Sequence, residues 1–111
     1  SHSRMKRLLE NEHFLQRIFH EDELKYAFAR ALPERALSSS FAAREAFKKA
    51  SGIPFFKVIF KGVWVERTEL GPVLEYNDEI RSSLQTCKAI RSHLSITHEN
   101  DLALAMVILE V

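Results

Sequence analysis

Residues 33–54 read PERALSSSFAAREAFKKASGIP, and this stretch predicts the longest helix of the chain. It is rich in Ala, Glu, Lys and Arg, which are strong helix formers, and its apolar positions include Leu37, Phe41 and Phe47. The run 51–54, Ser-Gly-Ile-Pro, ends the helix, because glycine closes helices readily and proline cannot continue one. We therefore expect a helix from Pro33 to Ala50 and place the other elements relative to it.

Upstream of this helix, the sequence predicts further helices. Between Ser3 and Phe19, apolar residues recur at helical spacing and basic residues occupy the other face, which indicates an amphipathic helix with a break near Asn11. A second helix is expected from Glu21 to Leu32, because its first turn is acidic and negative charge is favourable at a helix N-terminus. Pro33 ends it.

Downstream, the chain favours strands. Residues 55–66 are dense in Val, Ile, Phe and Trp, which predicts one or two strands with Gly62 at a bulge or turn. Residues 70–72, Leu-Gly-Pro, are typical of a hairpin connection, and a helix capped by Asn77 is expected to run to Cys87. The remaining expected elements are two strands, 93–97 and 102–111, joined by a turn at 99–101.

This order of elements predicts an α+β fold, in which N-terminal helices are followed by an antiparallel sheet. The last expected strand includes the run LALAMVIL at residues 102–109, which is apolar on both faces. A sheet face open to water would alternate with polar residues, so we expect this strand to be buried centrally or against a neighbouring subunit.

The composition limits the class of protein. The chain has 111 residues, 46% of them hydrophobic, which allows one domain over residues 1–111. A formal net charge of +1 indicates neither a nucleic-acid binder nor a charged tail. The single cysteine, Cys87, cannot form an intramolecular disulfide, and no zinc-site spacing is present. With neither a membrane span nor a signal peptide visible, we expect a cytoplasmic protein that contacts neither membrane nor nucleic acid.

Within the long helix, Glu45 and Lys49 are four residues apart, so their side chains lie one turn apart on the same face. A carboxylate there can hold Mg²⁺, and an amine can neutralise phosphate oxygens, as phosphoryl transfer requires. The alternative is an ordinary surface salt bridge, which is common at this spacing.

Two other groups of residues are candidates for chemistry. Residues 95–99, Ser-Ile-Thr-His-Glu, place a histidine at the end of a strand, where His98 can bind phosphate, carry a proton or simply form a structural hydrogen bond. The basic residues of the N-terminal region can meet an acidic partner helix or form an ordinary solvated face. They are Arg4, Lys6, Arg7 and Arg17.

These signals occur in the order found in one family, and the chain resembles the holo-acyl-carrier-protein synthases over nearly its whole length. Residues 41–50, FAAREAFKKA, resemble the family signature Phe-Ala-Ala-Lys-Glu-Ala-x-x-Lys-Ala. Residues 93–98, HLSITH, followed by the apolar strand, resemble its C-terminal block His-Val-Ser-Ile-Ser-His. Residues 12–24 and the Leu-Gly-Pro run at 70–72 also match the family pattern.

The resemblance implies a Mg²⁺-dependent transferase that moves 4′-phosphopantetheine from coenzyme A to a serine of an acyl carrier protein. It implies Glu45 as a Mg²⁺ ligand and Lys49, His98 and Glu99 as catalytic residues, with Glu99 at the position of a proposed general base. Coenzyme A contacts are implied for Arg44, Lys49, Gly52, Gly71, Pro72, Ser95, Thr97 and His98. Carrier-protein contacts are implied for Arg4, Arg7 and Arg17. The family is homotrimeric, with active sites between subunits.

The sequence also departs from the family pattern. The family's opening strand, Gly-Ile-Asp-x-Val-Glu-Ile, supplies a second metal ligand, and residues 1–111 start where that strand would be ending. Ser40 stands where an arginine is usual, and the loop at 51–54 is shorter than the family's Gly-Thr-Gly-Ile-Gly. Two other functions therefore stay open: a non-catalytic relative that binds coenzyme A or carrier protein, and an interaction domain without a ligand.

Overall fold

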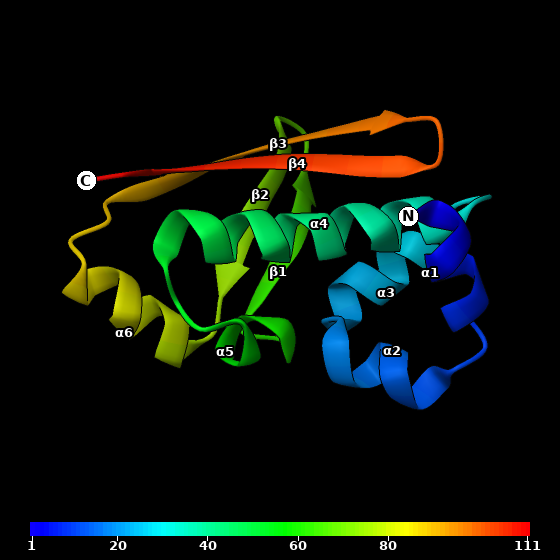
Figure 1. Cartoon of the computed structure of the whole chain (residues 1–111), viewed down its shortest axis with the longest axis horizontal. Helices are drawn as coiled ribbons and strands as arrows, with labels where there is room; N and C mark the ends of the chain where they lie inside the picture. Colours follow the sequence, from blue (N-terminus) through cyan, green and yellow to red (C-terminus); the bar gives the residue numbers. More distant parts are fainter.

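The N-terminal half of the chain is helical. In the computed structural model, which describes residues 1–111, helices α1 (His2–Leu8), α2 (Glu12–Ile18) and α3 (Glu21–Phe28) precede the long helix α4 (Pro33–Ser51) (Figure 1). The predicted break at Asn11 is confirmed, because its side chain accepts a hydrogen bond from the Phe14 amide at 3.0 Å and so caps α2. Helix α4 ends at Gly52, whose φ of 74° is the left-handed conformation that glycine adopts without strain.

Helix α3 is shorter than predicted. It ends at Phe28 rather than at Leu32, and Leu32 lies outside the helical region with φ −125° and ψ 79°. The helical conformation is disfavoured for a residue that precedes proline. Pro33 therefore keeps Leu32 out of α3, and it also opens α4. The resulting connection between α3 and α4 leaves Arg30 and Leu32 exposed beside a cavity.

The prediction of strand over residues 55–66 is wrong for its first half. Residues Phe55–Ile59 form a short helix, α5, and strand β1 begins only at Val63 (Val63–Thr68). A helix lets Val58 enter the core while Phe56 faces solvent, and this tertiary contact overrides the strand propensity of the residues. Gly62 lies in the turn that follows, where a Cβ atom would come within 2.0 Å of the Lys57 carbonyl oxygen, so the close approach requires glycine.

The C-terminal half contains two antiparallel hairpins. Strand β1 pairs with β2 (Gly71–Tyr76), and after helix α6 (Asp78–Thr86) strand β3 (Arg91–Glu99) pairs with β4 (Leu102–Glu110). The β3–β4 ribbon runs along α4 (Figure 1). The fold is therefore α+β with the helices first, as predicted, although the strands form two separate two-stranded sheets.

The terminal strand is not central, because β4 has only β3 as a neighbour. One of its faces lies against the core and α4 through Ala105, Val107 and Leu109. The opposite face stays exposed, and it consists of Leu102, Leu104, Met106 and Ile108. Contact of this face with a neighbouring subunit remains a prediction.

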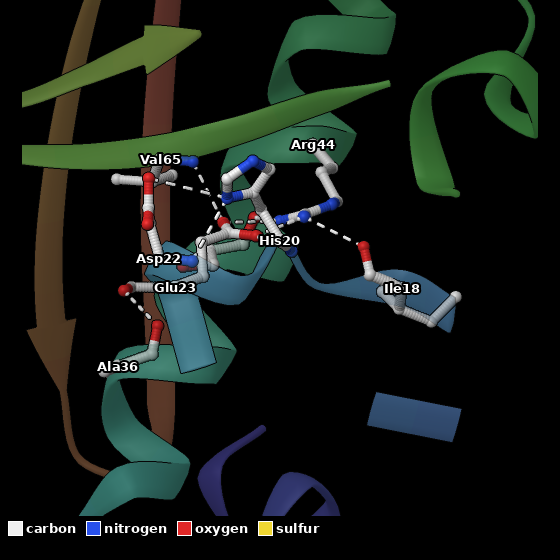
Figure 2. A network of polar contacts seen from close by, with 9 residues as sticks. Ile18, His20, Asp22, Glu23, Ala36, Arg44 and Val65 are labelled. Carbon is white, nitrogen blue, oxygen red and sulfur yellow. Dashed lines mark hydrogen bonds and ion pairs between the residues drawn. The ribbon is translucent and has the colours of Figure 1, made fainter. Parts of the chain in front are cut away.

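A buried ion pair between α3 and α4 lies where these helices meet the first hairpin. The guanidinium of Arg44 in α4 donates to both carboxylate oxygens of Glu23 in α3, and neither residue is more than 3% exposed (Figure 2). Glu23 also accepts from the backbone amides of His20 at 3.0 Å and Val65 at 2.9 Å. Because these partners come from α3, α4 and β1, the pair sets how the helices meet the first hairpin. No helix of the chain combines the length and the apolar character needed to span a membrane.

Candidate active site

The exposed face of α4 presents Glu45 and Lys49 as the sequence predicts. Both side chains are exposed, and they form no ion pair with each other, so the alternative of a simple surface salt bridge is not realised. Glu45 lies on two cavities of about 290 and 70 Å³, and Ser1, Met5 and Phe41 line both of them. The pair therefore leaves a carboxylate and an ammonium group free to meet a ligand together.

The residues around Glu45 can be compared with the needs of a magnesium ion. The chain contains no group of three or more His, Cys, Asp and Glu side chains that could hold a metal ion. Mg²⁺ in phosphoryl-transfer sites is commonly bound through one or two carboxylates, with substrate phosphates and water completing the octahedron. Glu45 fits the role of a single protein ligand in such a site, and residues 1–111 supply no second carboxylate beside it.

A third cavity, of about 410 Å³, lies where the α3–α4 connection, α4, β1 and the end of β3 meet. It is strongly basic, with Arg30, Arg35, Arg67 and His98 in its wall and no carboxylate among its lining residues. The guanidinium groups of Arg30 and Arg67 both lie over the ring of Tyr26, 4.8 and 4.7 Å from its centroid. We call this the arginine cavity.

Neighbouring groups affect the pKa of two basic side chains in the arginine cavity, Arg67 and His98. Arg67 donates to the Ser39 hydroxyl at 2.8 Å, and desolvation by burial lowers its pKa, although an arginine remains charged near neutral pH. Partial desolvation of the ring lowers the pKa of His98, and the nearby Arg35, His2 and Arg67 lower it further. A wall of fixed positive charge with a neutral imidazole is suited to holding an anion such as a phosphate group.

The end of β3 carries the other predicted residues. Ser95 and Thr97 lie on its exposed face, paired across the ribbon with Met106 and Leu104, and Glu99 is exposed at the last position of the strand. The imidazole of His98 meets a residue that sequence reasoning missed, since its Nδ1 atom lies 2.9 Å from Nε2 of His2.

The arginine cavity is separate from the two cavities beside Glu45 within one chain. The cavities beside Glu45 and the arginine cavity have no lining residue in common, so the structure does not bring Glu45 and His98 together in one pocket. Gly52 closes the helix that carries Lys49, whereas Gly71 and Pro72 begin β2, where Pro72 pairs with Arg67. Glu45 and Lys49 thus form one group on α4, and His98 in the arginine cavity forms another.

One predicted contact is corrected. Arg44 was expected to touch coenzyme A, but its side chain is fully buried. Its guanidinium donates to Glu23, to the Ser40 carbonyl and to the Ile18 carbonyl. With no exposed surface, Arg44 holds the fold together in this chain and is not placed to meet a ligand.

The predicted carrier-protein residues do not form one continuous face. Arg4 in α1 lines the cavity beside Glu45, and Arg7 is exposed in the last turn of the same helix. Arg17 in α2 lies over the ring of Phe60, 4.9 Å from its centroid. Arg4 is thus the predicted docking residue that the structure places beside the expected catalytic face.

Sequence reasoning also missed the arginine cavity. Arg30 and Arg35 flank Pro33 and carry no motif, and Arg67 follows more than thirty residues later, so only the packing of β1 against α3 and α4 brings them together. A weak signal existed in the clustering of Arg30 and Arg35 around a helix start, although isolated surface arginines are common.

The chain was compared with known proteins. Residues 1–107 match the model of the 4′-phosphopantetheinyl transferase superfamily. A holo-[acyl-carrier-protein] synthase of Thermus thermophilus is 37% identical over 110 residues, which are 97% of this chain and 85% of the relative.

Solved structures agree with this result. The crystal structure of holo-[acyl-carrier-protein] synthase from Neisseria meningitidis matches with a TM-score of 0.87 at 32% identity, covering 100% of this chain and 92% of that one. A coenzyme A complex of the synthase from Chronobacterium ammoniagenes matches with a TM-score of 0.77 at 26% identity, covering 94% and 85%. The chain therefore belongs to the 4′-phosphopantetheinyl transferase superfamily and, within it, to the holo-acyl-carrier-protein synthases.

Proposed function

We propose that this protein transfers the 4′-phosphopantetheine arm of coenzyme A to a serine of an acyl carrier protein, releasing adenosine 3′,5′-bisphosphate. The observation that carries the proposal is the exposed, unpaired Glu45 and Lys49 on one turn of α4 in a member of this family. The arginine cavity supports it, because coenzyme A carries several phosphate groups that need cationic partners.

In the proposed reaction, the serine hydroxyl of the carrier protein attacks the β-phosphate of coenzyme A. The new bond joins the serine oxygen to that phosphorus, and the bond from phosphorus to the oxygen bridging the two phosphates breaks. The ammonium group of Lys49 donates to the phosphate oxygens and offsets the charge on the departing group. Glu99 or a water molecule accepts the serine proton. His98 donates a hydrogen bond to a phosphate of the bound coenzyme A.

Magnesium belongs to the proposal as well. Glu45 would hold the ion, which would neutralise part of the charge on the diphosphate. The remaining contribution of the chain is positioning, because α4 is a rigid helix anchored by buried Leu37, Ala43 and Phe47. Side chains held on such an element keep their geometry better than side chains on loops.

We propose that the protein forms an oligomer, which the family resemblance implies is a trimer. Its support is the exposed apolar face of β4, on which Leu102, Leu104, Met106 and Ile108 are each 48–62% exposed. A row of aliphatic side chains on one strand is typical of a surface that another protein chain covers. Association would also let the Glu45 group of one protomer and the His98 group of another form one active site. Sedimentation of the full-length protein measures this directly, and a monomer would contradict it.

The carrier protein would approach the side of the molecule that bears Arg4. Acyl carrier proteins are acidic, and Arg4 is exposed beside the Glu45 cavity, with Arg7 in the next turn of α1. We also propose a cytoplasmic location, which is consistent with an exposed cysteine thiol, Cys87, that has no disulfide partner.

Intact-mass analysis of a carrier protein incubated with coenzyme A, Mg²⁺ and the full-length protein tests the function. We expect the carrier protein to gain one phosphopantetheine group, and a matched carrier protein with its acceptor serine changed to alanine to gain nothing. Binding of coenzyme A or carrier protein without any mass gain would instead identify a non-catalytic relative. Omitting Mg²⁺ while adding a chelator tests the metal requirement in the same assay.

A further inference from the structure

The imidazole rings of His2 and His98 form a pair that no pattern in the sequence predicts. His2 is 7% exposed in the first turn of α1, and its Nε2 atom lies 2.9 Å from Nδ1 of His98. The ring centroids are 5.0 Å apart and the ring planes are inclined by 35°. The contact joins two segments that lie 96 residues apart in the sequence.

Hydrogen bonds beside the two histidines hold their chain segments together. The His2 amide donates to the carbonyl of Asp101 at 2.8 Å, and the Ser3 amide donates to its carboxylate at 3.0 Å. The Ser3 hydroxyl donates to the same carboxylate oxygen at 2.8 Å. The start of α1 is therefore tied to the turn between β3 and β4, which begins two residues after His98.

The chemistry of the pair allows two neutral arrangements. One of the two facing nitrogens must carry the proton, because a neutral imidazole has one donor and one acceptor nitrogen. If His98 donated from Nδ1, its Nε2 atom would be a bare acceptor and would repel a phosphate oxygen. If His2 donates, His98 carries its proton on Nε2, the nitrogen left for a ligand in the arginine cavity.

We propose that His2 is a positioning residue for His98: it donates from Nε2 to Nδ1 of His98 and so fixes the tautomer that offers an Nε2–H group to a phosphate in the arginine cavity. This inference rests on the proposed function, because it takes that phosphate to belong to coenzyme A. The charged groups of the cavity are Arg30, Arg35 and Arg67, and the positive charges of Arg35 and Arg67 favour a neutral His98 over an imidazolium.

Variants at position 2 separate this role from simple packing. In His2→Gln the side-chain amide can still donate at the position of Nε2. In His2→Met the space is filled but no donor remains. In His2→Glu an ionised carboxylate can only accept, so His98 would have to turn its proton to Nδ1. His13→Met serves as the control, because His13 is exposed in α2 and lines neither the arginine cavity nor the cavities beside Glu45.

Nitrogen-15 NMR of the imidazole side chains in the full-length protein, without ligand, reads the tautomer directly. We expect His98 of the unaltered protein to be protonated on Nε2 and unprotonated on Nδ1, and His2→Gln and His13→Met to keep this state. His2→Met should lose the preference, and His2→Glu should move the proton to Nδ1. Circular dichroism checks that each variant is folded. If His2→Met does not fold, His2→Gln and His2→Glu still test the role of His2.

Steady-state kinetics give the second readout. His2→Met should raise KM for coenzyme A roughly tenfold, the size expected when one hydrogen bond to a charged group is weakened, with a smaller change in kcat. A proton on Nδ1 of His98 in the unaltered protein, or unchanged His98 shifts in folded His2→Met, would overturn the role of His2. The expected tautomer in a protein that never loads its carrier would instead overturn the proposed function.

Discussion

Replacing Arg44 by methionine should strongly lower the free energy of unfolding, because the carboxylate of Glu23 then stays charged and buried without a partner. Arg44 is completely buried and Glu23 is 3% exposed, so water cannot take over the lost contacts. The Ile18 carbonyl would also lose its donor, which now lies at 3.0 Å. Breaking a buried pair from one side costs about 3–5 kcal/mol, since the remaining charge is not compensated.

This magnitude is large for a chain of this size. For a domain of roughly 100 residues, about 1 kcal/mol corresponds to some 4 °C in the melting temperature, so Arg44→Met should melt about 12–20 °C lower. Urea denaturation followed by circular dichroism measures the free energy of unfolding, and all variants must be compared at one protomer concentration in case association contributes. Lys48→Met is the matched control, because Lys48 is exposed on the same helix and its change should stay within about 0.5 kcal/mol.

A second variant tests the stated cause. Combining Arg44→Met with Glu23→Gln removes the uncompensated charge, at the cost of one weaker interaction: the single amide oxygen can accept from only one of the His20 and Val65 amides, which donate to different oxygens of Glu23. The double variant should therefore be more stable than Arg44→Met alone. A loss below about 1 kcal/mol in Arg44→Met, or a double variant no more stable than the single one, would refute the reasoning.

The other predictions concern the proposed site. Lys49→Ala should lower kcat on the order of 100-fold, as expected for loss of one donor to a developing charge, and a defect confined to carrier-protein binding would contradict its role. Arg35→Gln should raise the pKa of His98 part of the way toward its ordinary value of 6.5. Desolvation by burial is the largest cause of the lowered pKa and remains in the variant, but the charge of Arg35, the second cause, is removed. In the unaltered protein the pKa of His98 is lower in the folded than in the unfolded chain, so the unfolded chain binds more protons at His98 between these two pKa values. The stability contributed by His98 should therefore decline as the pH falls from 6.5 toward the folded pKa. An NMR titration in which Arg35→Gln leaves the titration midpoint of His98 unchanged would exclude the charge effect. Reversing both Arg4 and Arg7 to glutamate should raise KM for carrier protein roughly 2- to 30-fold at low salt, less at high salt, with KM for coenzyme A unchanged as the internal control; equal efficiency in a folded double variant would move the docking face elsewhere.

Much of the fold could be read from local patterns. The long helix, the break at Asn11 and the α+β order all follow from spacing, capping residues and turn residues that act over a few positions. The error at Phe55–Ile59 has the opposite origin. Its residues favour strands, but packing of Val58 into the core favours a helix, and such a contact cannot be seen in a short window of sequence.

Arg44 shows how a motif can mislead about the site. It lies in the signature stretch at residues 41–50, and the family resemblance implied that it contacts coenzyme A. Its spacing from Leu37 and Phe47, seven and three residues away, already places it on the buried face of the helix. The spacing indicates burial, but only the tertiary structure identifies Glu23 as the partner that makes burial of a charge tolerable.

The sequence by itself determined the family, the helical character of the N-terminal half and the placement of Glu45 and Lys49 on one helix face, because these depend on residue types at short, regular spacing. Only the tertiary structure decided which basic residues share a cavity and which histidine meets His98. Arg35 and Arg67 are 32 residues apart and His2 and His98 are 96 apart. Contacts at such separations depend on how the β3–β4 ribbon and β1 pack against α1, α3 and α4, and no local pattern encodes that packing.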